Sequence, residues 1–260
     1  MKTALTPSAY RVLVVLGLAV TLGLSMGCKR DPNKVKQRYL ESGKRYEEQG
    51  KLKEASIQLS NALKVDHNFG DAHYQLAKVY LKQGLMMQAY AELMRTVDLQ
   101  PGNNAARIDL GNLLLTGQQA DKATEQAKAV LAADSNNADA YALLSSIASA
   151  KGDRAEALTQ IQHAISIDPK KAGYHASLGF LESSDPAKAA SAEEELRKAV
   201  SLDGKNVTAH LILAALLEKK GDIPGAEGEM KAAIAADPTS INARGSLANH
   251  YLRQGNPAKA

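Results

Sequence analysis

The sequence repeats itself at a fixed spacing, and this repeat constrains the fold more than any other feature. Alanine recurs every 34 residues along most of the chain, with one step of 35 between Ala157 and Ala192. The positions are Ala55, Ala89, Ala123, Ala157, Ala192, Ala226 and Ala260. Leucine keeps the same phase at Leu76, Leu110, Leu144, Leu178, Leu213 and Leu247. A chain with such a period is built from one small structural unit repeated along its length.

Each repeat contains two apolar stripes separated by a turn. In the second repeat, His73, Leu76, Ala77 and Tyr80 precede Gly84, and Ala89, Leu93, Thr96 and Val97 follow it. Spacings of three and four residues place each stripe on one face of a helix. The turn glycine recurs as Gly50, Gly84, Gly152, Gly221 and Gly255, and Gln118 replaces it once. Each repeat is therefore predicted to be a helix hairpin that stacks on the next, with the extra residue in the turn at 183–186.

This pattern resembles the tetratricopeptide repeat, a helix-turn-helix unit of 34 residues. The resemblance implies an all-α fold, a right-handed superhelical solenoid over residues 36–260. The predicted units are 36–69, 70–103, 104–137, 138–171, 172–206, 207–240 and a partial unit at 241–260. The large aromatic residue that the family carries early in its first helix is replaced here by Tyr39, His73, Arg107, Tyr141, His175, His210 and Arg244.

The resemblance also implies a concave groove, lined by the first helix of each unit, that binds a protein partner. The groove positions carried over from the family are Leu40, Lys44, Glu47, Tyr74, Lys78, Leu81, Ile108, Asn112, Leu115, Ala142, Ser146, Ala176, Phe180, Leu211, Ala215, Asn249 and Leu252. In the alternative interpretation, Leu40, Tyr74 and Leu211 complete the packing between units. The lysine and asparagine pairs of the chaperone-binding members are not present at these positions.

The first 27 residues have the layout of a bacterial export signal. Lys2 and Arg11 precede an uncharged apolar run from Val12 to Gly27. The segment from Leu24 to Cys28 resembles the lipobox of lipoproteins, in which the cysteine is acylated before the signal is cut. An uncleaved membrane anchor is the alternative, because this run is close to the minimum length for a membrane span. The resemblance predicts a signal peptide at 1–27, lipid on Cys28 and a short linker at 28–35.

The single cysteine supports the lipid assignment, since a lone thiol in an oxidising compartment needs another use. Several acyl chains on one residue anchor a protein stably to a membrane. Lys29 after the cysteine resembles the outer-membrane kind of sorting signal in bacteria with two membranes. We therefore expect the protein in the cell envelope, anchored to a membrane that is the outer one if there are two.

Charge and motif content favour neither nucleic-acid binding nor catalysis. Without Lys2 and Arg11 the chain has 30 Lys and Arg against 28 Asp and Glu, too balanced to neutralise many phosphates. His73, His175 and His210 share one repeat position, so they are expected to lie at successive units instead of converging on a metal. No nucleophile, metalloprotease or phosphate-loop motif is present. We expect no cofactor, no small-molecule substrate and no enzymatic activity within this sequence.

Two functional hypotheses follow. The first is a lipid-anchored scaffold that holds protein partners during assembly of an envelope complex, such as a pilus, a polysaccharide exporter or an exosortase (PEP-CTERM) system. The second is the substrate-presenting arm of a longer enzyme, such as a glycosyltransferase, with its catalytic domain beyond Ala260. The second is motivated by the end of the sequence, where the stripe of Leu247, Ala248 and Tyr251 is expected to lack a covering helix.

Overall fold

The computed structural model describes residues 31–260, and within this range every element of regular secondary structure is a helix. The predicted signal peptide and Cys28 lie outside the described residues. The α-helices are α2 (Pro32–Glu48), α3 (Leu52–Val65), α4 (Gly70–Lys82), α5 (Met86–Leu99), α6 (Asn104–Thr116), α7 (Ala120–Ala133), α8 (Ala138–Ala150), α9 (Arg154–Ile167), α10 (Ala172–Ser183), α11 (Ala189–Leu202), α12 (Val207–Lys220), α13 (Ile223–Ala236) and α14 (Ile241–Arg253). Two short 3₁₀ helices, η1 (Pro186–Lys188) and η2 (Pro257–Lys259), complete the described part. The predicted all-α repeat fold is confirmed.

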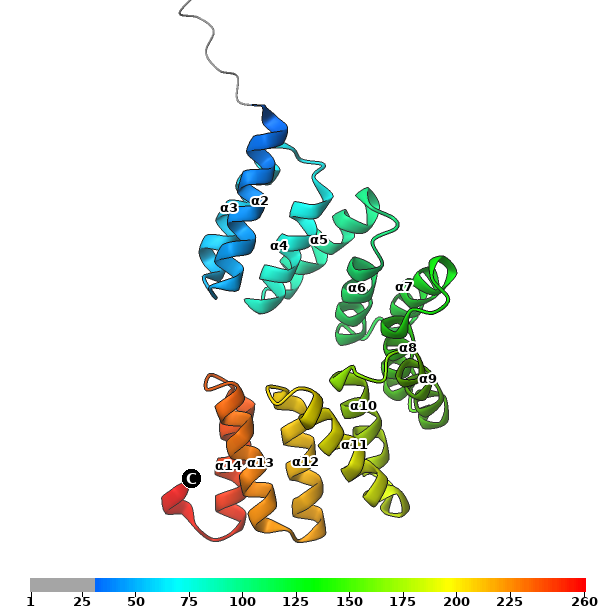
Figure 1. Ribbon diagram of the computed structural model, residues 1–260, viewed down its shortest axis with the longest axis vertical. Helices are drawn as coiled ribbons and strands as arrows, with labels where there is room; N and C mark the ends of the chain where they lie inside the picture. Colours follow the sequence, from blue (N-terminus) through cyan, green and yellow to red (C-terminus); the bar gives the residue numbers. More distant parts are fainter. Residues whose placement is uncertain (1–30) are drawn as a thin grey trace, which may run out of the picture. The chain divides into compact units, whose positions relative to one another are not determined.

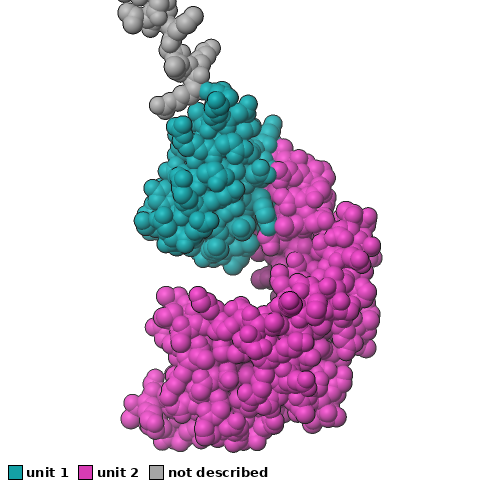
Figure 2. Space-filling model, viewed as in Figure 1, with its two compact units in different colours: residues 1–95 teal, residues 96–260 magenta. Residues whose placement is uncertain are grey.

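The chain divides into two compact units (Figure 2). Unit 1 ends at Arg95 and unit 2 comprises Thr96–Ala260. Within unit 2 the helices follow one another in chain order along a curved row (Figure 1), each packed against its neighbours. In unit 1, α2 packs on α3 and both contact α4. None of the helices between residues 31 and 260 combines the length and the apolar character that crossing a membrane requires.

Most helix starts coincide with the starts of the predicted repeats, at residues 70, 104, 138, 172, 207 and 241. The first repeat differs, because its helix begins at Pro32 and not at 36. The Asp31 carboxylate accepts a hydrogen bond from the amide of Asn33 at 3.0 Å, and proline suits the first turn of a helix. Residues 32–35, which were expected in the linker, therefore belong to α2.

The turns inside the hairpins depend on left-handed backbone conformations. The five turn glycines have φ between 70° and 83°, where a side chain is disfavoured. Gln118 takes the same conformation with φ of 58°, so the third predicted unit keeps the turn without the glycine. Between α10 and α11 the turn is longer and contains η1, with the Asp185 side chain accepting from the amide of Ala187 at 3.0 Å. The extra residue of the 35-residue step lies in this connection, as the sequence predicted.

Small residues let the two helices of a hairpin approach closely. The alanine at the periodic position is fully buried in every described unit that has a complete second helix, as with Ala157 and Ala192. A Cβ at Gly179 of α10 would lie 2.6 Å from the Cγ of Leu196 in α11, which no folded chain tolerates without rearrangement. Buried leucines at this contact stabilise the hairpin by about 1.5 to 3 kcal/mol each.

The end of the described chain is better covered than the sequence suggested. Tyr251 in α14 is buried, and its hydroxyl donates to a Glu227 carboxylate oxygen in α13 at 2.8 Å. Lys259 of η2 lies 5.6 Å from the centre of the Tyr251 ring. Leu247 and Ala248 are half-buried. Tyr251 of the expected stripe is thus covered by α13 and η2, whereas Leu247 and Ala248 are covered only in part.

Candidate functional site

Three connected hollows on unit 2 form the candidate site, which we call the groove. The largest, of about 630 Å³, is lined by residues of α8, α10 and α12. A second, of about 420 Å³, continues from α10 across α12 to Asn242 of α14, and a third, of about 200 Å³, lies at the turn between α8 and α9. Phe180 of α10 lines all three. The groove therefore follows the first helices α8, α10 and α12 and reaches the start of α14, which can be located by their labels in Figure 1.

The floor of the groove consists of small and hydroxyl-bearing side chains. Ser146 of α8 donates to the carbonyl of Ala142 at 3.0 Å, and Ser177 of α10 donates to the carbonyl of Gly173 at 3.0 Å. Each hydroxyl has only one proton, so these serine oxygens face the groove as hydrogen-bond acceptors. Such oxygens are suited to receive the backbone N–H groups of an extended peptide.

Phe180 supplies the apolar contact in the groove. Its side chain is 55% exposed, although it lies between the buried Leu181 and Gly179 on α10. Ile212 of α12 is half-buried and lines the groove beside it. An exposed aromatic ring in a concave surface is a common anchor for a protein partner.

The structure brings some of the predicted groove residues together. Those in the groove are Ser146, Ala176, Phe180, Leu211 and Ala215. On α6, also in unit 2, Asn112 is exposed while Ile108 and Leu115 are half-buried, and none of the three lines the groove. Leu252 on α14 is 54% exposed, and it lies outside these hollows too.

The predicted residues of unit 1 do not share this site. Leu40 is only 2% exposed and packs with Leu59 and Leu76, so the groove assignment of Leu40 was wrong and the packing alternative holds. Glu47 is also buried, where it accepts from Gln75 and pairs with Lys82 at 2.7 Å.

Three other predicted residues of unit 1, Lys44, Tyr74 and Lys78, remain partly exposed. Lys44 lies 3.1 Å from Glu41 of its own helix, and the ammonium of Lys78 lies 6.0 Å from the centre of the Tyr74 ring. Tyr74 and Lys78 are half-buried on α4.

Sequence reasoning missed several residues that line the groove, among them Ser177, Thr208, Arg154 and Lys219. Ser177 and Thr208 lie one turn or less from predicted positions on the same helices, so a wider stripe would have included them. Arg154 begins α9, a second helix, and lies outside any pattern based on first helices.

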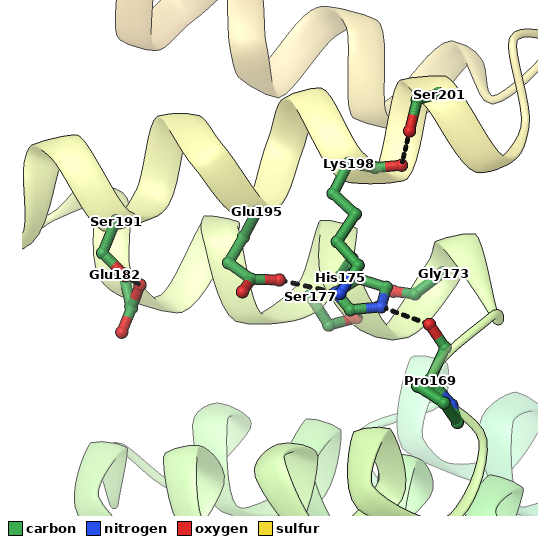
Figure 3. A network of polar contacts seen from close by, with 9 residues as sticks. All are labelled: Pro169, Gly173, His175, Ser177, Glu182, Ser191, Glu195, Lys198 and Ser201. Carbon is green, nitrogen blue, oxygen red and sulfur yellow. Dashed lines mark hydrogen bonds and ion pairs between the residues drawn. The ribbon is translucent and has the colours of Figure 1, made fainter.

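A recurring polar contact fixes the joints between hairpins. In Figure 3, the ring of His175 on α10 lies between Glu195 of α11 and the backbone of Pro169. Its Nδ1 is 2.5 Å from a Glu195 carboxylate oxygen, and its Nε2 is 2.9 Å from the Pro169 carbonyl oxygen. His175 therefore connects its own hairpin to the loop that precedes it.

The same contact occurs at the other two histidines of this repeat position. His73 lies 2.5 Å from Glu92 and 3.0 Å from the His67 carbonyl, and His210 lies 2.6 Å from Glu229 and 3.1 Å from the Gly204 carbonyl. Burial disfavours the charged ring of His73, but the hydrogen bonds to the Glu92 carboxylate and the His67 carbonyl outweigh it and raise the pKa of His73.

Residues other than histidine form part of this contact. Arg107, Tyr141 and Arg244 each donate to the carbonyl six residues earlier, at 3.0, 3.1 and 2.6 Å. The position that the family fills with a large aromatic residue is thus used here to hold the preceding loop. The three histidines lie on three different hairpins, on α4, α10 and α12, and the described residues contain no cluster of metal-binding side chains.

Family models match three stretches of the chain. Models described as TPR repeat or tetratricopeptide repeat match residues 43–84, 138–171 and 176–241. Among known proteins, DnaJ homolog subfamily C member 3 from Bos taurus is 32% identical over 124 residues, which is 48% of this chain and 24% of that protein. The chain thus matches about a quarter of the length of this relative.

Solved structures share the fold at low sequence identity. A tetratricopeptide repeat protein from Parabacteroides merdae aligns with a TM-score of 0.74 and 16% identity, over 90% of this chain and 89% of the other. PilF of Pseudomonas aeruginosa aligns with a TM-score of 0.61 and 16% identity, over 84% of this chain and 99% of the other.

Proposed function

This chain belongs to the tetratricopeptide-repeat family, and from that premise we propose that it is a scaffold that binds a protein partner in the groove of unit 2. We propose further that lipid on Cys28 holds it at a membrane of a bacterial cell envelope, where it supports assembly of an envelope complex. The repeat fold supports the first part, because stacked hairpins expose long surfaces that bind proteins. The lipobox-like segment before Cys28 supports the second part.

The observation that carries the proposal is the exposed ring of Phe180 at the junction of the three hollows. A side chain that only stabilised the hairpins would be buried, as Leu178 and Leu181 of the same helix are. The ring faces a surface of serine and threonine side chains that offers hydrogen bonds without bulk. This combination suits an extended segment of a partner with one apolar side chain.

A photo-crosslinking residue placed at position 180 of the full chain, in cells that produce it, tests the proposal. We expect a defined crosslinked protein from position 180 and none from position 202, because Leu202 is also exposed, at 39%, but lies on α11 outside the groove. Phe180→Ala should weaken recovery of the same partner about tenfold, since an aromatic anchor contributes about 1 to 2 kcal/mol. Equal crosslinking from both positions would contradict the proposal.

A further inference from the structure

The charged residues that line the groove all have the same sign. Arg154 lines the hollow at the α8–α9 turn, and Lys219 of α12 lines the hollow that runs from α10 across α12; Phe180 lines both. The remaining lining residues of the three hollows are uncharged, with no aspartate or glutamate among them. The groove therefore presents two positive charges, in two hollows that share an exposed aromatic ring.

These two cations are not neutralised by the protein, whereas the cations near them are. Lys151 pairs with Asp121 at 2.8 Å, Lys188 with Glu182 at 3.6 Å, and Lys220 with Glu193. Lys219 reaches only the backbone carbonyl of Ser183, at 3.4 Å.

Arg154 has no ion pair with any described residue, and its Nη2 is shielded from solvent without a hydrogen-bond acceptor. A guanidinium that has lost part of its hydration and has no counter-charge is a favourable partner for a carboxylate.

The serine oxygens of the groove, as hydrogen-bond acceptors, indicate what the backbone of a ligand must offer. The oxygens of Ser146 and Ser177 can receive backbone N–H groups, as their own protons are already donated to their helices. Phe180 offers a flat apolar contact. The matching ligand has free N–H groups along an extended backbone, an apolar side chain and carboxylates near it.

We propose that the groove of unit 2 binds an extended acidic peptide segment, with an apolar side chain on Phe180 and carboxylates paired with Arg154 and Lys219. This inference rests on the proposed function, because it names the chemistry of the partner that the groove takes. It assigns Arg154 and Lys219 to selection among partners and Phe180 to affinity for any of them.

Selection from a library of random 12-residue peptides on the full chain in detergent tests this assignment. We expect the selected peptides to contain at least about three times more aspartate and glutamate than the input library, and to lose this enrichment on the Arg154→Gln, Lys219→Gln double variant. Raising the salt from 50 to 300 mM should weaken the selected peptides about tenfold, since these charge pairs are partly exposed.

Matched variants separate the possible failures. The Lys151→Gln, Lys220→Gln double variant removes the same charge outside the groove and should keep the enrichment. The single variant Arg154→Lys preserves the positive charge in the groove and should keep much of the enrichment. Peptides that depend on Phe180 but are not acidic would overturn the acidic preference and leave the proposed function standing. Acidic peptides selected equally by the Arg154→Gln, Lys219→Gln variant would overturn the assignment of the two cations. Peptides unaffected by Phe180→Ala would count against the groove itself and thus against both proposals.

Discussion

A single side chain at the joint between hairpins serves two purposes in this protein. His73 contacts the second helix of its hairpin through Glu92 and the preceding loop through the His67 carbonyl. The carbonyl can only accept a hydrogen bond, and the ionised carboxylate can only accept as well. Both ring nitrogens of His73 must therefore donate for both contacts to form, and this favours the charged ring.

The stability that His73 provides should consequently depend on pH. Its pKa is raised in the folded state, so its contribution is fully present below the pKa of the unfolded chain, about 6.5, and is lost as the pH rises through the higher folded value. We expect Glu92→Gln to lower the pKa of His73, measured by NMR titration of the ring protons. The same change should reduce the free energy of unfolding by about 1 to 2 kcal/mol at pH 5 and by less at pH 9.

Glu48→Gln is the matched control for this prediction, because Glu48 is exposed near the end of α2 and forms no ion pair among the described residues. It should leave the titration of His73 unchanged. If Glu92→Gln also left it unchanged, the carboxylate would not be what holds the charge on the ring.

At the scale of the helix hairpin, the turn decides how well two helices can pair. Five hairpin turns use glycine at positive φ, and one uses Gln118 at 58°. A residue with a Cβ is strained in this region by about 1 to 2 kcal/mol. The hairpin of α6 and α7 therefore keeps its geometry at a cost that the other hairpins avoid.

Gln118→Gly should relieve that strain and increase the free energy of unfolding by about 1 kcal/mol. Urea unfolding followed by helical circular dichroism measures the change. The reverse substitution in the next hairpin, Gly152→Gln, should decrease stability by a similar amount, because Gly152 has φ of 83° and an added Cβ would meet no other atom within 4 Å, so only the backbone strain changes. A neutral result for both would indicate that neither turn is strained.

The hairpins were the part of the fold that the sequence predicted best. The alanines and leucines that recur every 34 residues mark the buried helix faces, because the same position packs in the same way in each repeat. The start of α2 was missed because it depends on Asp31 and Pro32, a local capping signal outside the repeat phase. Leu40 was misplaced because its side chain belongs to the buried cluster that packs α2 against Leu59 of α3 and Leu76 of α4.

At the scale of the whole molecule, the charge of the groove could not be predicted from the sequence. Lys219 and Lys220 are neighbours in the chain, yet only Lys220 meets a carboxylate, that of Glu193. Which cations remain unpaired depends on where every nearby carboxylate is used, and this is known only once the helices are packed. The hydrogen-bonding role of the lining serines is equally hard to predict from the sequence, because each hydroxyl donates to a carbonyl of its own helix.

The whole molecule is also the scale at which the membrane anchor matters. If Cys28 carries lipid, labelled palmitate should enter the wild-type protein and should not enter Cys28→Ala, which should also move from the membrane to the soluble fraction. Lys29→Ala is the control, because it leaves the acylated cysteine in place and should keep the label. Label in Cys28→Ala would mean that the lipid is attached elsewhere or that the signal segment is read differently.

The serine hydroxyls along the groove have one more consequence for what the molecule can select. Ser146 and Ser177 donate their hydroxyl protons to their own helices, so a partner that hydrogen-bonds to these oxygens must donate N–H or O–H protons of its own. Proline has no amide proton to bring. We therefore expect segments rich in proline to bind this surface weakly even where their charge matches. The backbone of a partner would then decide its binding as much as its side chains do.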